Sequence, residues 1–474
     1  MMKAYYILIS IGFAAMAHVT SANVDTMNGI DPDATVTRLQ QNLPQTDVKM
    51  ALPVNTDGAW SLDSCINYAI SQNLTVKERM INKLQGDLAI DEARSGFYPS
   101  VYASANESLS FGRGLTSENT YANRNTTNFQ WGLNAQMPVF DGLRSWRQLK
   151  YEKINLNTLL YQVEAAKDDV TLNVITAYLQ VLYAYEVLLT AQNQVELAAY
   201  EVERQQALAD AGKIAEIDLL EAKSQLAQDQ LQVVTSINDY TTAVLDLAQL
   251  LQLPSIDGFS VEILDNAETL PIIPMPEEVY RLALLNNYNI KASQNAILAA
   301  DKNVLVAKSG WFPSISLNGG IGSSFYTVSG FDSDSFGRQM RENFSKMIGV
   351  SLSVPIFDGM STSNNVRRAR LQTTLAKLQL DQAETELYRT IQTAYYQATG
   401  ARESYKTAVE TEKIAQEAFN AMQEKYNIGR ATPQEFEQSK TTLLGMTLQR
   451  IRSRYECLLR YRVLKFYEGT SRSL

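Results

Sequence analysis

The sequence predicts a mainly helical protein that also carries β-strands able to cross a membrane, built from one unit that occurs twice. Three observations support this prediction. Short motifs recur in the same order in the two halves of the chain. Apolar residues follow a heptad pattern over very long stretches, which is typical of coiled-coil helices. Apolar and polar residues alternate in shorter stretches, as expected for strands with two different faces.

Three motifs mark the duplication, and each occurs once in either half. They are Gly-Phe-Tyr-Pro (96–99) and Gly-Trp-Phe-Pro (310–313), Pro-Val-Phe-Asp-Gly (138–142) and Pro-Ile-Phe-Asp-Gly (355–359), and a glycine followed by a basic residue (Gly212 with Lys213, Gly429 with Arg430). Three landmarks in one order indicate an internal repeat, in which each copy is one structural unit.

The motifs divide the chain into five segments. They are a signal peptide (1–22), a polar N-terminal arm (23–58), a first repeat (59–275) with strands within about 97–140 and a turn near 212, a second repeat (276–467) with strands within about 311–357 and a turn near 429, and a C-terminal tail (468–474). The apolar run at 5–17 is too short to span a bilayer and fits a signal-peptide core. No later apolar run is unbroken over about 18 residues, so we expect no membrane-spanning helix.

Composition excludes several classes of function. The net charge of −9 argues against nucleic acid as a partner. The single histidine, His18, lies in the predicted signal peptide, so the mature chain has no histidine base, no Ser-His or Cys-His pair and no histidine metal ligand. We therefore expect no enzyme activity, no cofactor and no metal. Cys65 and Cys457 could form a disulfide or remain two buried thiols, and the sequence does not decide between them.

In each repeat a first helix is followed by two strands. The helix at 61–94 ends at the Gly-Phe-Tyr-Pro motif, because glycine and proline do not continue a helix cheaply. Residues 129–137 then alternate strictly, and 98–110 are their expected partner, with a loop at 112–128 between them. The second repeat has the same pattern, with alternation at 314–321 and 348–354 and a loop at about 327–343.

These strands have the length of about ten residues that a tilted strand needs to cross a bilayer. The alternative is a pair of soluble hairpins packed on a core. Four strands cannot close a barrel, so a membrane sheet of this size must be shared between chains. Three chains with four strands each would supply a barrel of twelve strands. Trp131, Tyr98 and Phe312 either belong to an aromatic girdle at the membrane surface or pack where the strands meet the helices.

The remaining helices are very long. Asp141 and Asp358 are expected to cap the helices that follow the strands. The helix at 143–210, roughly 70 residues, spans about 105 Å, whereas its return to Leu253 covers only about 60 Å. The helix at 276–308 supplies about 50 Å more, so we expect it to stack end to end on the first return helix. The same comparison of lengths predicts that the helix at 61–94 stacks end to end on the return helix of the second repeat. Both chain ends then lie partway along the helices, between the strands and the two turns.

The outgoing helix of the first repeat carries a heptad seam in which alanine alternates with larger apolar residues. The seam consists of Val174, Ala177, Val181, Ala184, Leu188, Ala191, Val195, Ala198 and Val202. Spacings of three and four alternate along it, as in a coiled coil, and the alanines let partner helices approach closely.

With these motifs in this order, the chain resembles the TolC family of outer-membrane efflux proteins over nearly all of residues 60–467. The segment Leu-Ala-Gln-Leu-Leu-Gln-Leu-Pro at 247–254 adds to the resemblance. The resemblance implies a homotrimer with a twelve-stranded barrel in the outer membrane and an antiparallel coiled-coil tunnel across the periplasm. It also implies that a periplasmic adaptor and an inner-membrane transporter dock at the tip of the tunnel.

The resemblance assigns roles to residues at the two turns. Glu435 occupies a position of the acidic ring that narrows the tip, and Gln438 occupies a second position but carries no charge, so a double acidic ring is not supported. Tyr426 and Asp218 occupy the places of a Tyr-to-Asp link that locks the closed tip. Ala431 replaces the basic residue of a second link. From the residues alone, Glu435 and Asp218 fit equally well as solvated residues at helix starts.

The resulting expectation is a passive export duct whose energy comes from the partner pump. The adaptor is expected to contact the exposed turns at Gly212, Lys213, Gly429 and Arg430, and outer-membrane lipid is expected to surround the barrel. One alternative is a channel for type I protein secretion. Another, from a different class, is a structural coiled-coil protein of the envelope that forms no channel.

Overall fold

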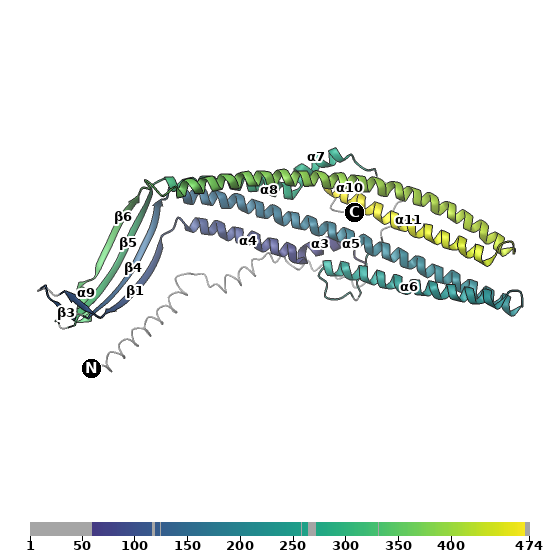
Figure 1. The fold of residues 1–474 in the computed structure, drawn as a ribbon, viewed down its shortest axis with the longest axis horizontal. Helices are drawn as coiled ribbons and strands as arrows, with labels where there is room; N and C mark the ends of the chain where they lie inside the picture. Colours follow the sequence, from purple (N-terminus) through teal and green to yellow (C-terminus); the bar gives the residue numbers. More distant parts are fainter. Residues whose placement is uncertain are drawn as a thin grey trace, which may run out of the picture. The chain divides into compact units, whose positions relative to one another are not determined.

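The computed structural model describes residues 59–115, 119–123, 125–256, 258–263, 272–329 and 331–469 (Figure 1). The chain divides into two units, residues 1–59 and residues 60–474. Every helix and strand described below belongs to the second unit. The predicted signal peptide and polar arm, and residues 470–474 of the predicted tail, lie outside the described residues.

The order of elements is the same in the two halves of this unit: two helices, two long strands, a very long helix and a shorter return helix. The first half contains α3 (Leu62–Gln72), α4 (Leu74–Ser95), β1 (Ser100–Ser110), β2 (Arg113–Leu115), β3 (Tyr121–Asn123), β4 (Thr126–Phe140), α5 (Arg144–Asp210) and α6 (Glu216–Leu250). The second half contains α7 (Pro276–Asn286), α8 (Tyr288–Lys308), η1 (Ser309–Trp311), β5 (Ser314–Val328), α9 (Phe336–Glu342), β6 (Ser345–Ser353), α10 (Ser361–Asn427) and α11 (Pro433–Glu468).

The four long strands form one antiparallel sheet in the order β1-β4-β5-β6. The central pair joins the two halves of the chain, with Leu133 opposite Ile321. The predicted fold class, mainly helical with four strands per chain, is confirmed. The two connections that we expected to be plain loops are more ordered: β2 and β3 form a short hairpin in one, and α9 is a short helix in the other.

The helices predicted at 61–94 and 276–308 are each broken in two by an asparagine. Asn73 separates α3 from α4, and its Oδ1 accepts from the backbone N of Thr75 at 2.8 Å. Asn287 separates α7 from α8 in the same way, accepting from Asn289 at 3.0 Å. An asparagine side chain that caps the following turn offers the backbone an alternative to a continuous helix. The long helices begin two residues later than expected, with Leu143 and Met360 at the N-cap positions. Asp141 and Asp358 still bind the first turns, accepting from the backbone N of Ser145 at 2.9 Å and of Thr362 at 2.7 Å.

The predicted end-to-end stacking pairs the wrong helices. The start of α3 lies at the end of α6, where the backbone N of Trp60 donates to Ser260 at 2.8 Å and Leu62 packs in one cluster with Leu247. Likewise Val279 of α7 packs with Leu464 of α11. Each return helix is therefore extended by the opening helices of its own half (Figure 1). The two predicted opening helices have similar lengths, so a sum of lengths could not distinguish the two arrangements.

Helix α5 forms the centre of the packing. Its residues Val174, Tyr178 and Leu182 are buried against α3 and α6, and six of the nine predicted seam residues are buried: Val174, Val181, Ala184, Leu188, Ala191 and Ala198. By length and composition alone, α5 is the one described helix that could cross a membrane, which the search for an unbroken apolar run overlooked. Half of its most apolar window is buried inside the structure, as in a core helix.

The two cysteines are free and buried in the structure. Burial raises the pKa of Cys65 to about 12 and also raises that of Cys457 above its ordinary value. Both thiols are therefore inert packing residues at physiological pH.

Candidate functional site

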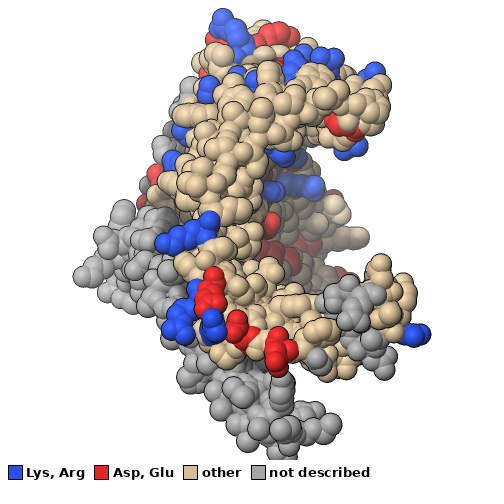
Figure 2. Space-filling view, turned by 90° about the vertical axis from the view of Figure 1, so that its left-hand side faces the viewer, with Lys and Arg blue, Asp and Glu red and all other residues tan. Residues whose placement is uncertain are grey.

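The sheet has one apolar face and one polar face. Because the strands are in register, residues of one kind line up across them. The apolar face includes Val101, Ala103, Leu133, Ala135, Met137, Leu317, Ile321, Ile348, Val350 and Leu352, with the charged residues Glu107 and Lys346 toward its far end. The polar face consists of Ser104, Asn134, Gln136, Ser316, Asn318, Gly320, Gly349 and Ser351. Figure 2 views the strand end and shows a broad area that carries neither acidic nor basic residues.

The apolar face and the two sheet edges are uncovered in the single chain. The side chain of Ile348 is 81% exposed and that of Val350 is 71% exposed. Strands β1 and β6 form the two edges and have a neighbour on one side only. A contiguous exposed apolar surface marks contact with lipid or another protein, and an open edge offers hydrogen bonds to a further strand.

The three aromatic residues of the sequence analysis lie at different levels. Phe312 is at the junction with the helices, where the Arg147 guanidinium lies 5.4 Å from its ring centre. Tyr98 precedes β1 at the same end and is largely exposed. Trp131 lies well inside β4, with its ring centre 6.4 Å from that of Phe344. Phe312 thus packs at the strand–helix junction, whereas Trp131 belongs to the far part of the sheet.

The two predicted turns lie at the other end of the long helices, opposite the strands (Figure 1). Gly212 has φ +66° and Gly429 has φ +72°, a left-handed conformation that closes each hairpin. Lys213 and Arg430 follow, and their backbone N atoms donate back to the ends of α5 and α10 at 2.9 and 2.8 Å. These four residues are exposed, so a partner protein can reach them.

Glu435 and Asp218 cap the helices that leave the turns. The Glu435 carboxylate accepts from the backbone N of Thr432 at 2.8 Å and from its hydroxyl at 2.9 Å. These bonds hold the pKa of Glu435 below its ordinary value. Asp218 accepts from the backbone N of Ala215 at 3.2 Å. Gln438 lies one turn beyond Glu435 and is exposed. Within one chain these groups act as helix-start residues, which was the second interpretation of the sequence.

Tyr426 has partners other than Asp218 within the chain. Its hydroxyl donates to Glu201 at 2.7 Å and accepts from the Gln205 amide. Its ring stacks on Phe436 at 4.6 Å, with the planes 12° apart. The Arg204 guanidinium lies 4.5 Å from the same ring. Tyr426 is 8% exposed, so these contacts form a buried joint between α5 and the α10–α11 hairpin.

Further polar contacts join the α5–α6 hairpin to the α10–α11 hairpin. Glu186 of α5 lies 3.7 Å from Arg450 and 3.5 Å from Arg454, both on α11. Lys440 of α11 lies 3.8 Å from Asp229 of α6, and the Lys440 side chain is only 8% exposed. We call this set, with Glu201 and Tyr426, the polar seam. Inside each hairpin, alanine and larger apolar residues are buried along the long helices, and Arg450 of α11 also pairs with Glu412 of α10 at 2.7 Å.

A model of the protein family described as "Outer membrane efflux protein" matches residues 66–252 and 279–470. The chain belongs to this family. The resemblance to TolC proteins that the motifs indicated is thereby confirmed, and it places this efflux protein in the outer membrane with its helical tunnel in the periplasm. The strand end therefore lies in the membrane and the turns point away from it.

Among the curated relatives of this efflux protein, one is named for efflux and another for protease secretion. Outer membrane protein TolC of Escherichia coli is 23% identical over 398 residues, which is 80% of this chain and 76% of TolC. Outer membrane efflux protein BepC of Brucella suis is 21% identical, covering 77% and 76%. Alkaline protease secretion protein AprF of Pseudomonas aeruginosa is 24% identical, covering 61% and 60%. Such relatives are channel proteins and not enzymes, and they support an efflux or secretion duct.

Solved structures support the fold. The Campylobacter jejuni CmeC outer membrane channel aligns with a TM-score of 0.70 at 19% identity, covering 87% of both chains. The open state of the Neisseria gonorrhoeae MtrE outer membrane channel aligns with a TM-score of 0.67 at 18% identity, covering 87% of this chain and 90% of that one.

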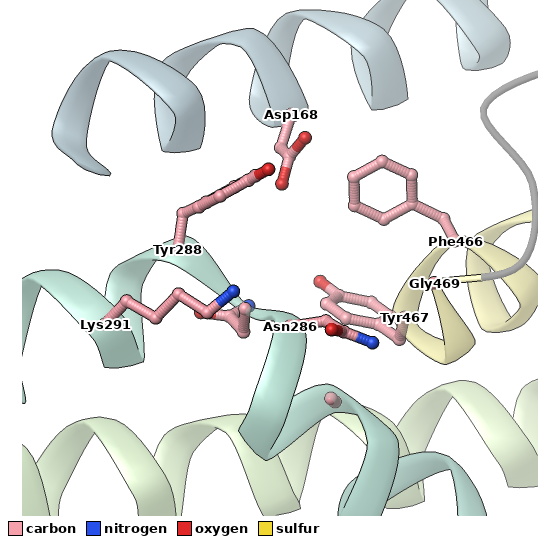
Figure 3. Close-up of a pocket in the computed structure, with 9 residues that line it drawn as sticks. Asp168, Asn286, Tyr288, Lys291, Phe466, Tyr467 and Gly469 are labelled. Atoms are coloured by element: carbon pink, nitrogen blue, oxygen red, sulfur yellow. The ribbon is translucent and has the colours of Figure 1, made fainter. Parts of the chain in front are cut away.

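A cavity of about 310 Å³ lies where the break between α7 and α8 meets the end of α11 (Figure 3). Asp168 of α5, Tyr288 and Lys291 of α8, and Phe466 and Tyr467 of α11 line it. These side chains offer hydrogen bonds and ring faces where the helices meet.

The sequence correctly predicted that the turns at 212–213 and 429–430, and the capping residues Glu435 and Asp218, lie at the end of the long helices opposite the strands. It missed Glu201, Gln205, Asp229 and Lys440, which hold the hairpins together there. Glu201 lies 225 residues from Tyr426, and no periodicity in one sequence links positions so far apart.

Proposed function

We propose that three copies of this chain form a passive export duct in the outer membrane. In this assembly β6 of each copy pairs with β1 of the next, so that three four-stranded sheets close into one barrel of twelve strands. The observation that carries the proposal is the sheet itself: it has two open edges, an exposed apolar face and an opposite polar face. Closure would put the apolar face against lipid and the polar face around a water-filled passage.

The helical tip is the gate in this proposal. Each copy contributes two hairpins, and the polar seam between them is the contact that opens, because its hydrogen bonds and ion pairs can be remade with water. Glu435 and Gln438 line the constriction together with Asp218, and Tyr426 holds it closed. Three Glu435 carboxylates around one axis would repel one another and attract cations.

A periplasmic adaptor docks at Gly212, Lys213, Gly429 and Arg430, and an inner-membrane transporter supplies the energy. The exposure of both turns and the similarity to TolC and CmeC support this part of the proposal. Lys213→Glu together with Arg430→Glu should then weaken adaptor capture without changing the trimer. The name of AprF favours secreted proteins as a second class of cargo, which export assays on folded-domain substrates and on small drugs would separate.

The decisive experiment measures the native mass of the detergent-extracted protein and its current across a planar bilayer. A mass of three chains together with a steady current is expected. A monomer, or a trimer that passes no current, would contradict the duct. Glu435→Ala should change the conductance or its block by cations, and unchanged single-channel behaviour would place Glu435 outside the passage.

A further inference from the structure

Helix α9 takes the place of the missing upper part of β6. Strand β6 pairs with β5 only from Ser314 to Gly322, although β5 continues to Val328. Beyond that point Gln339 of α9 binds the backbone of Tyr326 twice, accepting from its N at 3.0 Å and donating to its O at 3.1 Å. Asn343 donates to the Ser324 carbonyl at 2.7 Å. These side chains satisfy backbone groups that a strand would otherwise pair, so α9 is fixed to the sheet.

Aromatic side chains tie α9 to the apolar face. The Phe336 ring centre lies 5.1 Å from that of Phe325 and 5.6 Å from that of Phe129. Phe344 packs on Trp131 in the same way. By register, Phe129, Trp131 and Phe325 are in line with Leu133 and Ile321 of the apolar face. We call these five rings the aromatic collar: Phe129, Trp131, Phe325, Phe336 and Phe344.

One basic side chain stands at the collar, and a second basic residue, Arg341, lies between Phe336 and Phe344 in the sequence. Lys346 is opposite Ile321 in the register, which puts it on the apolar face, and its ammonium lies 5.8 Å from the Phe344 ring centre. Arg341 is on α9, and both residues are exposed. Neither has an ion pair among the described residues. Arg338 of the same helix differs, because it pairs with Asp334 at 3.1 Å and with Glu342 at 2.9 Å.

Helix α9, which carries Phe336, lies at the end of the strands that points away from the helical tunnel (Figure 1). Since the tunnel is in the periplasm, this end faces the outer leaflet. Aromatic rings concentrate at the boundary between lipid tails and headgroups. Basic side chains there reach with their charged ends toward the headgroup phosphates.

We infer that the aromatic collar, with Arg341 and Lys346, holds the phosphate-bearing headgroup of an anionic lipid of the outer leaflet. The rings contact the upper acyl chain, and the two cations contact the phosphate. The inference rests on the proposed function in one respect, because the apolar face must lie in lipid. The bound lipid would fix the depth and rotation of each sheet at the outer surface, where β6 ends before β5 does.

The experiment uses native mass spectrometry of the full-length protein, titrated with phosphatidylglycerol and, separately, with phosphatidylcholine. Arg341→Gln combined with Lys346→Gln should weaken phosphatidylglycerol binding by about fivefold for each charge removed, because a basic residue near an anionic surface contributes roughly that factor. Phosphatidylcholine binding should not change. Arg338→Gln is the matched control, since its guanidinium is already paired, and it should leave both affinities unchanged.

Three results would overturn the inference: equal phosphatidylglycerol affinity in the double variant and the unmodified protein, loss of affinity for both lipids alike, or full competition by millimolar inorganic phosphate.

A further variant tests whether Lys346 has a protein partner instead of lipid. Glu107 stands on the apolar face of β1, and β1 of the next copy would adjoin β6 in a closed barrel. If Glu107→Gln raises phosphatidylglycerol affinity as much as the double variant lowers it, Lys346 pairs with Glu107 in the unmodified protein, which would contradict its contact with lipid there. The mass of the protein is read in the same spectra, so a monomer would contradict the duct, whereas a trimer with unchanged lipid affinity would contradict the lipid site alone.

Discussion

The hydroxyl of Tyr426 donates a 2.7 Å hydrogen bond to the carboxylate of Glu201, and this bond joins two hairpins that are far apart in the sequence. Burial raises the pKa of Tyr426 above its ordinary value, and the bond to Glu201 raises it further. The tyrosine therefore stays protonated and remains a donor at every physiological pH. The bond lies near the turns and is one of several polar contacts between the two hairpins.

Tyr426→Phe should loosen this joint. The variant keeps the stacking on Phe436 but leaves the Glu201 carboxylate and the Gln205 amide without their partner, at a cost of about 1–3 kcal/mol. In a planar bilayer we expect longer or larger openings than in the unmodified protein. Tyr396→Phe, at an exposed tyrosine of α10, is the control. If the two variants show the same openings, the Tyr426 hydroxyl has no role in gating.

The contribution of Lys440 to the free energy of unfolding should depend on the charge of Asp229, its partner in the polar seam. Lys440→Met leaves Asp229 buried beside Glu437 without a cation, and we expect a loss of about 3 kcal/mol in the free energy of unfolding. Adding Asp229→Leu removes the stranded charge and should restore most of that loss. Urea unfolding monitored by circular dichroism measures both. A double variant no more stable than Lys440→Met would show that the pair is not coupled.

The stability of the first turn of α11 should depend on pH through the ionisation of Glu435. Its pKa in the folded chain is lowered by the hydrogen bonds from Thr432, so the ionised form is the one that stabilises the turn. This contribution is fully present above the unfolded-state value of about 4.3 and is lost as the pH falls through the lower, folded-state value. Hydrogen exchange of the first turn of α11, corrected for intrinsic rates, should therefore speed up below about pH 4.3.

Glu435→Gln provides the matched comparison, because glutamine keeps the capping geometry but does not titrate. The same turn should then show no such acid-dependent loss of protection. If protection in the variant falls as steeply as in the unmodified protein, another group controls the acid response.

The two glycines Gly429 and Gly400 should respond in opposite directions to alanine. Gly429 has φ +72°, where an added Cβ meets no neighbour but the backbone is strained, so Gly429→Ala should destabilise by about 1 kcal/mol. Gly400 lies in the exposed middle of α10 with open space around it. Gly400→Ala should therefore stabilise by up to about 1 kcal/mol. Urea unfolding of the two variants, compared in parallel, checks the signs.

Local patterns predicted much of this fold. The alternation at 129–137 predicted β4, and the heptad seam from Val174 to Val202 predicted α5, because each signal repeats over many residues. The turns at Gly212 and Gly429 were predictable because a left-handed helix end requires glycine. Helix α9 was missed, since its seven residues are too few for a periodic signal and stand in a loop-like context.

Contacts between distant segments were not predictable in the same way. The lengths of the opening helices fit two stacking schemes equally, and they are distinguished by the shared clusters of Leu62 with Leu247 and of Val279 with Leu464. The partner of Tyr426 was taken from the family resemblance as Asp218, whereas the chain pairs it with Glu201. A single sequence records which residues are apolar, but it does not record which acid a buried tyrosine meets.

The pairing of β4 with β5 has a consequence for biogenesis. The central seam of the sheet joins segments that leave the export machinery far apart in time, so the first half cannot complete the sheet by itself. Such non-local pairing is slow to form, and the apolar residues of β1 and β4 stay uncovered until the second half arrives. We therefore expect a chain truncated before Ser314 to aggregate or be degraded, because β4 then has no β5 to pair with.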